Sequence, residues 1–253
     1  MAELVSLTND EGIVTLSLRR PEARNALSLE MIEALEAAVA RIATDTSARV
    51  LVLRGEGKAF CAGMDLRGVL HDAARMGHML HGLARASLAI RRLSVPAVAC
   101  VRGAAIGGGC GLMIACDLAV THAEARCGYP EVELGICPAV VAPLLMRRIG
   151  AGRARAMLLT GGVVDGTEAL RLGLATHLAP EADLESATLD LARKLRSGGA
   201  NALATTKRWL ADLEPELGDQ VMRQAADLSA RIIQGEEAQS RLKARFEAAR
   251  PAS

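Results

Sequence analysis

One wholly apolar strand that runs into a glycine-rich segment constrains the fold more than any other feature of this chain. The run Pro96–Val101 contains no polar side chain, and five glycines follow within Gly103–Gly111. A strand with two apolar faces needs cover on both of them, which the parallel sheets of α/β proteins provide. A second apolar strand is predicted at Arg49–Leu53. The sequence therefore predicts an α/β fold.

The remaining patterns alternate between strand and helix as far as residue 121 and are mainly helical after Pro143. A hairpin is predicted around Asn9–Gly12, Ser28 is a good helix N-cap, and a largely helical stretch ends near Leu93. Further predicted elements are a strand at Asp117–Thr121, helices at Leu144–Ile149, Arg153–Leu159, Thr167–Leu172, Leu184–Leu195 and Ala202–Leu210, a short strand at Ala175–Leu178, and one long helical stretch from Glu216 to Ala249. No linker separates independent domains. We expect a core over residues 1–195 and a helical region over residues 196–253 that packs on the core or on a neighbouring subunit.

Charge and composition argue against several classes of partner. The net charge of +1 and the four aromatic residues argue against nucleic acid as a partner. The longest apolar run is too short to span a bilayer, and the N-terminus does not resemble a signal peptide. Six cysteines occur without a C-x-x-C pair, which is typical of buried thiols in a reducing compartment. We therefore expect a cytoplasmic protein without membrane or metal.

Several familiar catalytic motifs do not occur. The chain has no G-x-S-x-G and no G-x-x-x-x-G-K-[ST], and its glycine run does not match G-x-G-x-x-G because Leu112 stands where the last glycine should be. Three histidines, His71, His78 and His81, share one predicted helix. A metal site there lacks further ligands apart from Asp72, so solvated helix-face histidines are the preferred interpretation.

Two segments carry the chemical information: Lys58–Leu66, and the run from Val95 through the glycines to Leu118. Each is a predicted strand-to-helix turn in which small residues let backbone N–H groups point outward. Two such turns side by side could hold one oxygen between two N–H donors, and a helix beginning at Gly108 would add its dipole. The alternative is that the glycines only let a helix pack closely on the sheet.

Taken together, these motifs resemble the crotonase, or enoyl-CoA hydratase/isomerase, superfamily. The resemblance rests on F-C-A-G-x-D-L at 60–66 and on G-G-G-C with C-D-L at 107–118, and it extends to an early turn at 20–27 and to Y-P-E at 129–131. It implies a crotonase-like spiral of ββα units, a helical C-terminal region for trimerisation, and an acyl-CoA thioester as substrate. Coenzyme A would enter as part of the substrate, with no separate cofactor, and the protein would be a homotrimer or hexamer.

The resemblance also implies the roles of individual residues. The N–H groups of Met64 and Gly108 would bind the thioester oxygen, and Glu131 would be the catalytic carboxylate. Arg24 and Arg67 would meet the CoA phosphates, while Ala26, Ala62 and Leu66 would surround the adenine. Family hydratases carry a second glutamate just after G-G-G-C, where this chain has Gly111. That change would leave either a gap for a bulky acyl group or a drier site.

The single glutamate favours double-bond isomerisation, because one base can remove a proton and return it at another carbon, whereas hydration is easily pictured with two carboxylates. Enoyl-CoA hydratase activity is the close alternative, a decarboxylase or hydrolase comes third, and a degenerate acyl-CoA-binding homologue is a further possibility. Glu133 is assigned to packing and Asp65 to capping the next helix. Met64, Met76, Met79 and Leu83 are candidates for the acyl pocket, with the core as the alternative.

Overall fold

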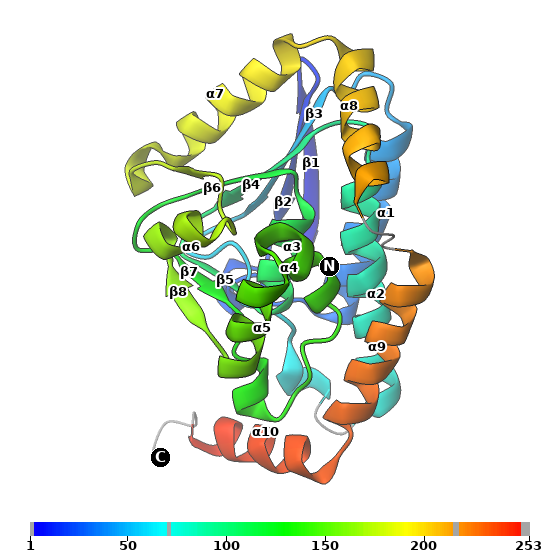
Figure 1. Ribbon diagram of the computed structural model, residues 1–253, viewed down its shortest axis with the longest axis vertical. Coiled ribbons are helices and arrows are strands. Elements are labelled where there is room, and N and C mark those ends of the chain that lie inside the picture. Colours follow the sequence, from blue (N-terminus) through cyan, green and yellow to red (C-terminus); the bar gives the residue numbers. More distant parts are fainter. Residues whose placement is uncertain (1–2, 70–71, 215–217, 249–253) are drawn as a thin grey trace.

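A six-stranded sheet forms the centre of the computed structural model, which describes residues 3–69, 72–214 and 218–248 (Figure 1). The strands lie in the order β1-β2-β3-β4-β6-β9, and only the β1–β2 pair is antiparallel. Their bounds are β1 Val5–Asp10, β2 Ile13–Leu18, β3 Val50–Gly55, β4 Ala97–Val101, β6 Leu118–Thr121 and β9 His177–Leu178. The predicted hairpin is confirmed, with Glu11 and Gly12 at positive φ between β1 and β2.

Both faces of the sheet are covered, as the apolar strands require. Leu51 and Leu53 of β3 belong to the main core, whereas Val50 and Val52 face a second cluster that includes Leu184. Because successive residues of a strand point to opposite faces, an apolar run is buried only if helices lie on both sides. The α/β prediction is therefore confirmed.

A second, three-stranded sheet turns the fold into a spiral. It has the order β5-β7-β8, with bounds β5 Ala104–Ile106, β7 Arg126–Gly128 and β8 Val163–Asp165. Cys61 extends it through a parallel bridge to Ala105. The chain thus passes repeatedly from the large sheet to the small one and then into a helix. Sequence patterning missed these strands because three residues are too few to show an alternation.

In the described part of the chain, six α-helices precede the C-terminal region: α1 Leu29–Thr44, α2 Ala73–Arg92, α3 Gly108–Ala115, α4 Ala142–Ile149, α5 Ala151–Thr160 and α6 Gly166–Leu172. The Ser28 side chain accepts a hydrogen bond from Met31 N at 3.2 Å, so the predicted N-cap of α1 is confirmed. Asp65 does not cap the next α-helix. The N-cap of α2 is Asp72, whose side chain accepts from Arg75 N at 2.9 Å.

The C-terminal helices are α7 Leu184–Ser197, α8 Ala200–Leu213, α9 Asp219–Ile233 and α10 Glu236–Ala248. The single helical stretch predicted from Glu216 onward is wrong, because α9 and α10 are separated at Gln234 and Gly235. Glycine has poor helix propensity. In addition, the Gln239 side-chain amide donates a hydrogen bond to the Ile233 carbonyl, which would accept a backbone N–H in a continuous helix. Residues 1–2, 70–71, 215–217 and 249–253 of the predicted regions lie outside the described residues.

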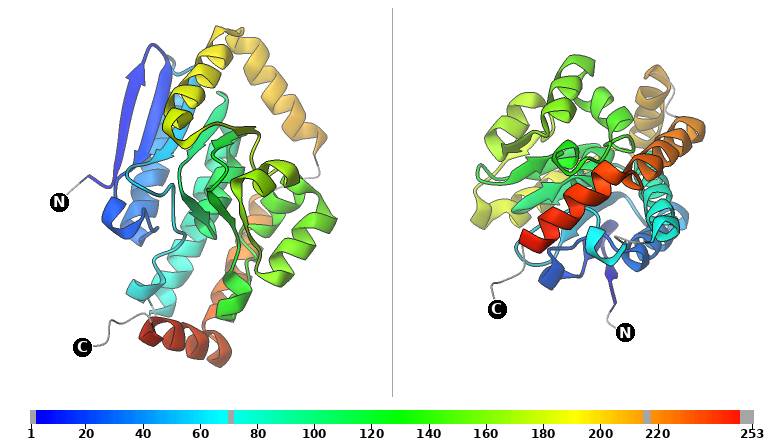
Figure 2. Two further views of the ribbon diagram at one scale, coloured as in Figure 1. Left: turned by 90° about the vertical axis from the view of Figure 1, so that its left-hand side faces the viewer. Right: turned by 90° about the horizontal axis from the view of Figure 1, so that it is seen from below.

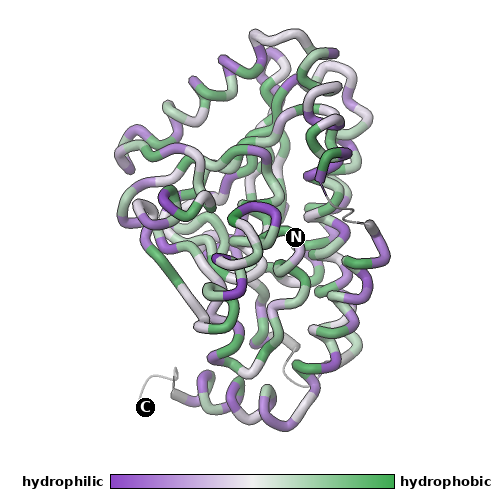
Figure 3. The backbone as a smooth tube through the Cα atoms, viewed as in Figure 1, coloured by the Kyte–Doolittle hydropathy of each residue, from purple (hydrophilic) through white to green (hydrophobic). Residues whose placement is uncertain are grey.

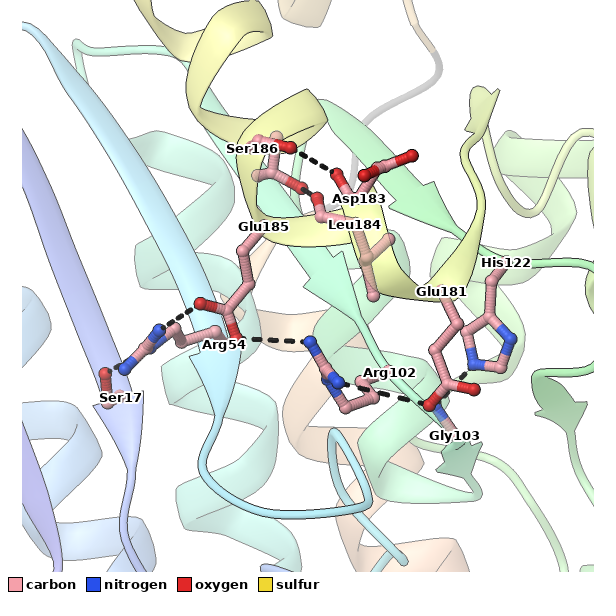
Figure 4. Close-up of polar contacts among 11 residues, drawn as sticks. Ser17, Arg54, Arg102, Gly103, His122, Glu181, Asp183, Leu184, Glu185 and Ser186 are labelled. Atoms are coloured by element: carbon pink, nitrogen blue, oxygen red, sulfur yellow. Dashed lines mark hydrogen bonds and ion pairs between the residues drawn. The ribbon is translucent and has the colours of Figure 1, made fainter.

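These helices attach to the core in different ways (Figure 2). Helix α7 packs on β3, β4 and β6, and α9 packs along α2. Figure 4 shows Arg54 and Arg102, at the carboxyl ends of two parallel strands, both reaching Glu185 of α7. The predicted boundary at residue 195 falls inside α7. Since α7 packs on the sheet, this helix belongs to the core layer. Hydrophobic and hydrophilic stretches alternate along α8, which has no buried residue (Figure 3).

Candidate active site

The two informative segments lie side by side in the small sheet. Cys61 N donates to Ala104 O at 2.9 Å, and Ile106 N donates to Cys61 O at 3.0 Å. A Cβ at Gly109 would lie 2.3 Å from Cys61 O, and one at Gly103 would lie 2.1 Å from Lys58 O. The close-packing explanation of the glycines is therefore correct for Gly103 and Gly109.

Gly107, Gly108 and Met64 form a different kind of turn. Helix α3 begins at Gly108, after Gly107 at a φ of 55°. Within the described part of the chain, neither Met64 N nor Gly108 N donates a hydrogen bond to another protein atom. A Cβ at Gly63 would lie 3.8 Å from Gly108 N, so the two turns adjoin. Two free N–H groups on adjoining turns, one of them at a helix N-terminus, form a site suited to a developing oxyanion.

Both turns open into an apolar pocket of about 640 Å³, part of it open to solvent. Its walls come from the two turns, α2, the segment after Pro130, and α9; the lining residues include Ala62, Leu66, Leu80, Leu83, Ile106, Leu134, Ile136, Cys137, Pro138, Val140, Val141, Ser229 and Ile233. Met64 and Leu83 line this pocket, whereas Met76 and Met79 are buried in the core. The pocket interpretation thus holds for two of the four candidates and the core interpretation for the other two.

Glu131 places a single carboxyl group in this pocket. It begins a 3-10 helix, Glu131–Leu134, and a Cβ at Gly107 would lie 2.9 Å from its Oε1. Its Oε2 is buried without a hydrogen-bond partner in the described structure. Burial raises the pKa of Glu131 to about 7, against the opposing effect of a backbone hydrogen bond. Such a group can both take and return a proton near neutral pH.

Gly111 does not leave a gap. A Cβ at this position would lie 2.8 Å from Cγ1 of Val141, and Val141 itself lines the pocket. The first of the two expectations for Gly111, an open space for a bulky acyl group, is therefore wrong. An aliphatic side chain fills the space beside Gly111, and this wall of the pocket is apolar.

The early turn lies against the first of the two segments. Arg24 and Asn25 both have positive φ, and the buried Asn25 side chain donates to Glu56 O at 2.9 Å and Ala59 O at 2.8 Å. Ala62 N donates to Arg24 O at 2.9 Å. This arrangement brings Arg24 and Ala26 next to the segment that carries Ala62 and Leu66.

The arginines near this turn have different environments. Arg24 and Arg67 are exposed, and the Arg67 guanidinium lies 5.4 Å from the centroid of the Phe246 ring on α10. Arg20 instead pairs with Asp65 at 2.7 Å. This ion pair holds the early turn to the segment after Met64. Asp65 directly precedes the short 3-10 helix Leu66–Val69, and its capping of that helix stays a prediction.

The remaining titratable candidates lie outside the pocket. Glu133 is exposed, and its backbone carbonyl contacts Arg241 of α10, which fits the expected packing role. His81 pairs with Asp227 of α9 at 3.0 Å, and His71 lies outside the described residues. Over residues 3–69, 72–214 and 218–248, no three His, Cys, Asp or Glu side chains are grouped to hold a metal ion. None of the described helices has the length and apolarity to cross a membrane.

Sequence reasoning missed Val141 and the contribution of α9. Ser229 and Ile233 of α9 line the pocket, and Ser229 Oγ donates to Cys137 O at 2.8 Å. Val221, Ala225, Leu228 and Ile232 form an apolar stripe at helical spacing along α9. Three of these are exposed by about two fifths (Val221 40%, Leu228 38%, Ile232 42%), because the next face of the helix packs on α2. The buried face lies one position further along the helix, and Ser229 and Ile233 belong to it. The same helical spacing, shifted by one residue, is the sequence signal that indicates the pocket-lining face.

Comparisons with known proteins place nearly the whole chain in one protein family. The enoyl-CoA hydratase/isomerase family profile matches residues 8–251. A Thermus thermophilus protein named as an enoyl-CoA hydratase is 38% identical over 211 residues, which is 81% of this chain and 83% of the relative. Human enoyl-CoA hydratase domain-containing protein 3, mitochondrial, is 32% identical over 74% of this chain and 62% of its own length. The crystal structure of an enoyl-CoA hydratase from Bacillus halodurans superposes with a TM-score of 0.89 at 26% identity, covering 95% of this chain and 99% of that one. The fold is the crotonase fold, and the chain belongs to the enoyl-CoA hydratase/isomerase family.

Proposed function

We propose that the protein is an enoyl-CoA double-bond isomerase with one catalytic carboxylate. The observation that carries the proposal is the pocket wall beside the free N–H groups. It holds the buried carboxyl of Glu131, while Val141 fills the space beside Gly111 where family hydratases have their second glutamate. A site with one base and an apolar wall suits proton transfer between carbons better than the addition of water.

In the proposed mechanism the thioester oxygen accepts hydrogen bonds from Met64 N and Gly108 N. The Glu131 carboxylate removes a proton from C2 of a 3-enoyl thioester, and the electrons move through C2 to the carbonyl oxygen, giving a dienolate. The same carboxyl group then returns the proton at C4, so that the double bond moves to C2–C3 and the base is regenerated. Losing one oxyanion donor typically costs on the order of 10²–10³ in rate.

The substrate proposal follows from the mouth of the pocket. Exposed Arg24 and Arg67 are suited to the CoA phosphates by charge-assisted hydrogen bonds, and Ala26, Ala62 and Leu66 are small or apolar enough to surround an adenine. For Arg67 to bind phosphate, its guanidinium must leave the Phe246 ring. CoA enters as part of the substrate, and no further cofactor is proposed.

Hydration of a 2-enoyl-CoA is the second candidate, favoured by the names of the Thermus and Bacillus halodurans relatives. It requires an acid that the pocket does not supply beside Gly111. Binding of acyl-CoA without turnover is the third candidate. The free N–H pair and the raised pKa of Glu131 favour catalysis over this alternative.

A substrate panel with a matched pair of variants tests the proposal. Wild type is incubated with 2-enoyl and 3-enoyl CoA thioesters, and the products are separated by chromatography and identified by mass. We expect interconversion of the two isomers with little 3-hydroxyacyl product. Glu131→Gln should abolish turnover, whereas Glu133→Gln, two positions further along the same 3-10 helix but outside the pocket, should retain it. Rapid 3-hydroxyacyl formation by wild type would establish the hydratase alternative.

We also propose that the protein assembles as a homotrimer or hexamer and that it acts in the cytoplasm. The half-exposed apolar residues of α9 and the exposed Trp209, Leu210 and Leu213 of α8 support the assembly, because a lone chain leaves them in water. Sedimentation should give three or six times the mass of 26.5 kDa.

A further inference from the structure

A second cavity lies away from the proposed active site, between the carboxyl end of α2, helix α4 and helix α8. It encloses about 1550 Å³, part of it open to solvent, and shares no lining residue with the apolar pocket. Its lining carries seven charged side chains, whereas that of the first pocket carries Glu131 alone. Its lining residues are Leu88, Arg91, Arg92, Leu93, Ser94, Arg147, Ala204, Lys207, Arg208, Ala211, Asp212 and Glu214.

Cationic side chains predominate in the lining of this cavity. Five of them line it (Arg91, Arg92, Arg147, Lys207 and Arg208), against two acidic ones (Asp212 and Glu214). Two of the five pair with carboxylates outside the lining, Arg92 with Asp219 and Lys207 with Asp117. With these two partners counted, five cations face four acids, and Arg91 and Arg147 share the single carboxylate of Glu214.

Two of the arginines converge on one carboxylate oxygen. Oε2 of Glu214 accepts from Arg91 and, at 3.0 Å, from Arg147 Nη1. The Arg147 side chain is only 13% exposed, and burial together with the positive charge of Arg91 lowers its pKa. Lys207 also lines the cavity, and its side chain is 12% exposed. Its Nζ donates hydrogen bonds to Val95 O and Asp117 Oδ2. The two guanidiniums therefore stand around one anionic oxygen that comes from the chain itself.

We propose that this cavity binds a ligand with two or more phosphoryl groups. A phosphoryl group would replace the Glu214 carboxylate between Arg91 and Arg147, where it gains bidentate charge-assisted hydrogen bonds. A second phosphoryl group would reach the exposed Arg208 on the rim and the exposed Arg92, where it would replace the Asp219 carboxylate that pairs with Arg92 at 2.9 Å. Glu214 caps the carboxyl end of α8 and is partly exposed, so its side chain can turn out to water when the ligand enters. The proposal does not depend on the activity of the first pocket.

The test is calorimetric titration of the full chain with inorganic pyrophosphate at low ionic strength. Arg147→Gln should weaken binding by about tenfold or more, because it removes a charged donor. Glu214→Gln should tighten binding, since it removes the competing carboxylate and leaves both arginines in place. Arg155→Gln is the matched control: it removes the same charge from an exposed position on α5 and should change nothing.

Two further arms identify the bound species. Arg24→Gln separates this cavity from the proposed CoA turn, which could also attract pyrophosphate, and it should leave the affinity unchanged. A titration with adenosine diphosphate shows whether the cavity prefers a nucleotide to a bare diphosphate. Tighter binding of adenosine diphosphate than of pyrophosphate indicates a nucleotide ligand, and equal binding indicates a bare diphosphate. If Arg147→Gln unfolds the chain, as circular dichroism would show, Arg91→Gln and Glu214→Gln take its place. The proposal is overturned by absence of saturable binding, by equal weakening in Arg155→Gln, by loss in Arg24→Gln, or by weaker binding in Glu214→Gln.

Discussion

The buried carboxyl of Glu131 should control both the activity and the pH dependence of stability. Its pKa is raised from 4.5 to about 7 by burial, which corresponds to about 3 kcal/mol in favour of the neutral form. If the ionised carboxyl is the base, kcat/KM should rise with pH and level off above about 7. At pH 5 about 1% of the carboxyl is ionised, so the rate should be about one hundredth of its plateau. A carboxyl with the ordinary pKa of 4.5 would leave most of the activity at pH 5.

The same shift predicts the sign of a stability change. The folded protein holds this proton more tightly than the unfolded chain, so the stabilising contribution is present below pH 4.5 and is lost as the pH rises through about 7. Glu131→Gln keeps the shape of the side chain but cannot ionise. It should therefore raise the melting temperature by several degrees at pH 8 and leave it unchanged at pH 4, while abolishing turnover.

Calorimetric melts at both pH values and initial rates between pH 5 and 8, with Glu133→Gln as the exposed control, measure the two effects. A rate that is flat from pH 5 to 8 would refute the raised pKa. An unchanged melting temperature for Glu131→Gln at pH 8 would refute burial as its cause.

Three further predictions test the rest of the site and the assembly. Gly108→Pro removes the N–H at the first residue of α3, where proline is tolerated, so the fold should persist in circular dichroism. Turnover should fall by a factor on the order of 10², because one oxyanion donor is lost. Gly108→Ala keeps the N–H and needs only the end of Leu83 to shift, so this variant should retain more activity. Gly111→Glu alone should destabilise the fold, because the new side chain would clash with Val141. The double variant with Val141→Gly should raise the ratio of 3-hydroxyacyl to isomerised product. An unchanged ratio would contradict the role given to the missing glutamate. Deletion after Gly235 should dissociate the assembly or prevent folding, and a stable, active monomer in sedimentation would contradict the proposed role of the C-terminal region.

Local chemistry made several elements predictable. The Ser28 cap, the Glu11–Gly12 turn and the apolar strand before Gly103 each follow from a short run of residues, and all three lie where patterning placed them. The helical break at Gln234 and Gly235 was missed because helix-forming residues lie on both sides of it, and one glycine is tolerated within a helical pattern. The three-residue strands of the small sheet carry no periodicity of their own and exist through their pairing with distant segments.

The sequence by itself determined the α/β class, the order of the two glycine-containing turns, and the presence of one candidate carboxylate, Glu131, since these depend on residue type and near neighbours. Only the tertiary structure decided which glycines leave N–H groups free and which merely allow close packing, because that depends on what the facing segment places within 3 Å. It also decided that Val141, thirty positions from Gly111, fills the space beside it. The raised pKa of Glu131 is likewise a tertiary property, because the carboxyl group is desolvated only when folding buries it in the pocket.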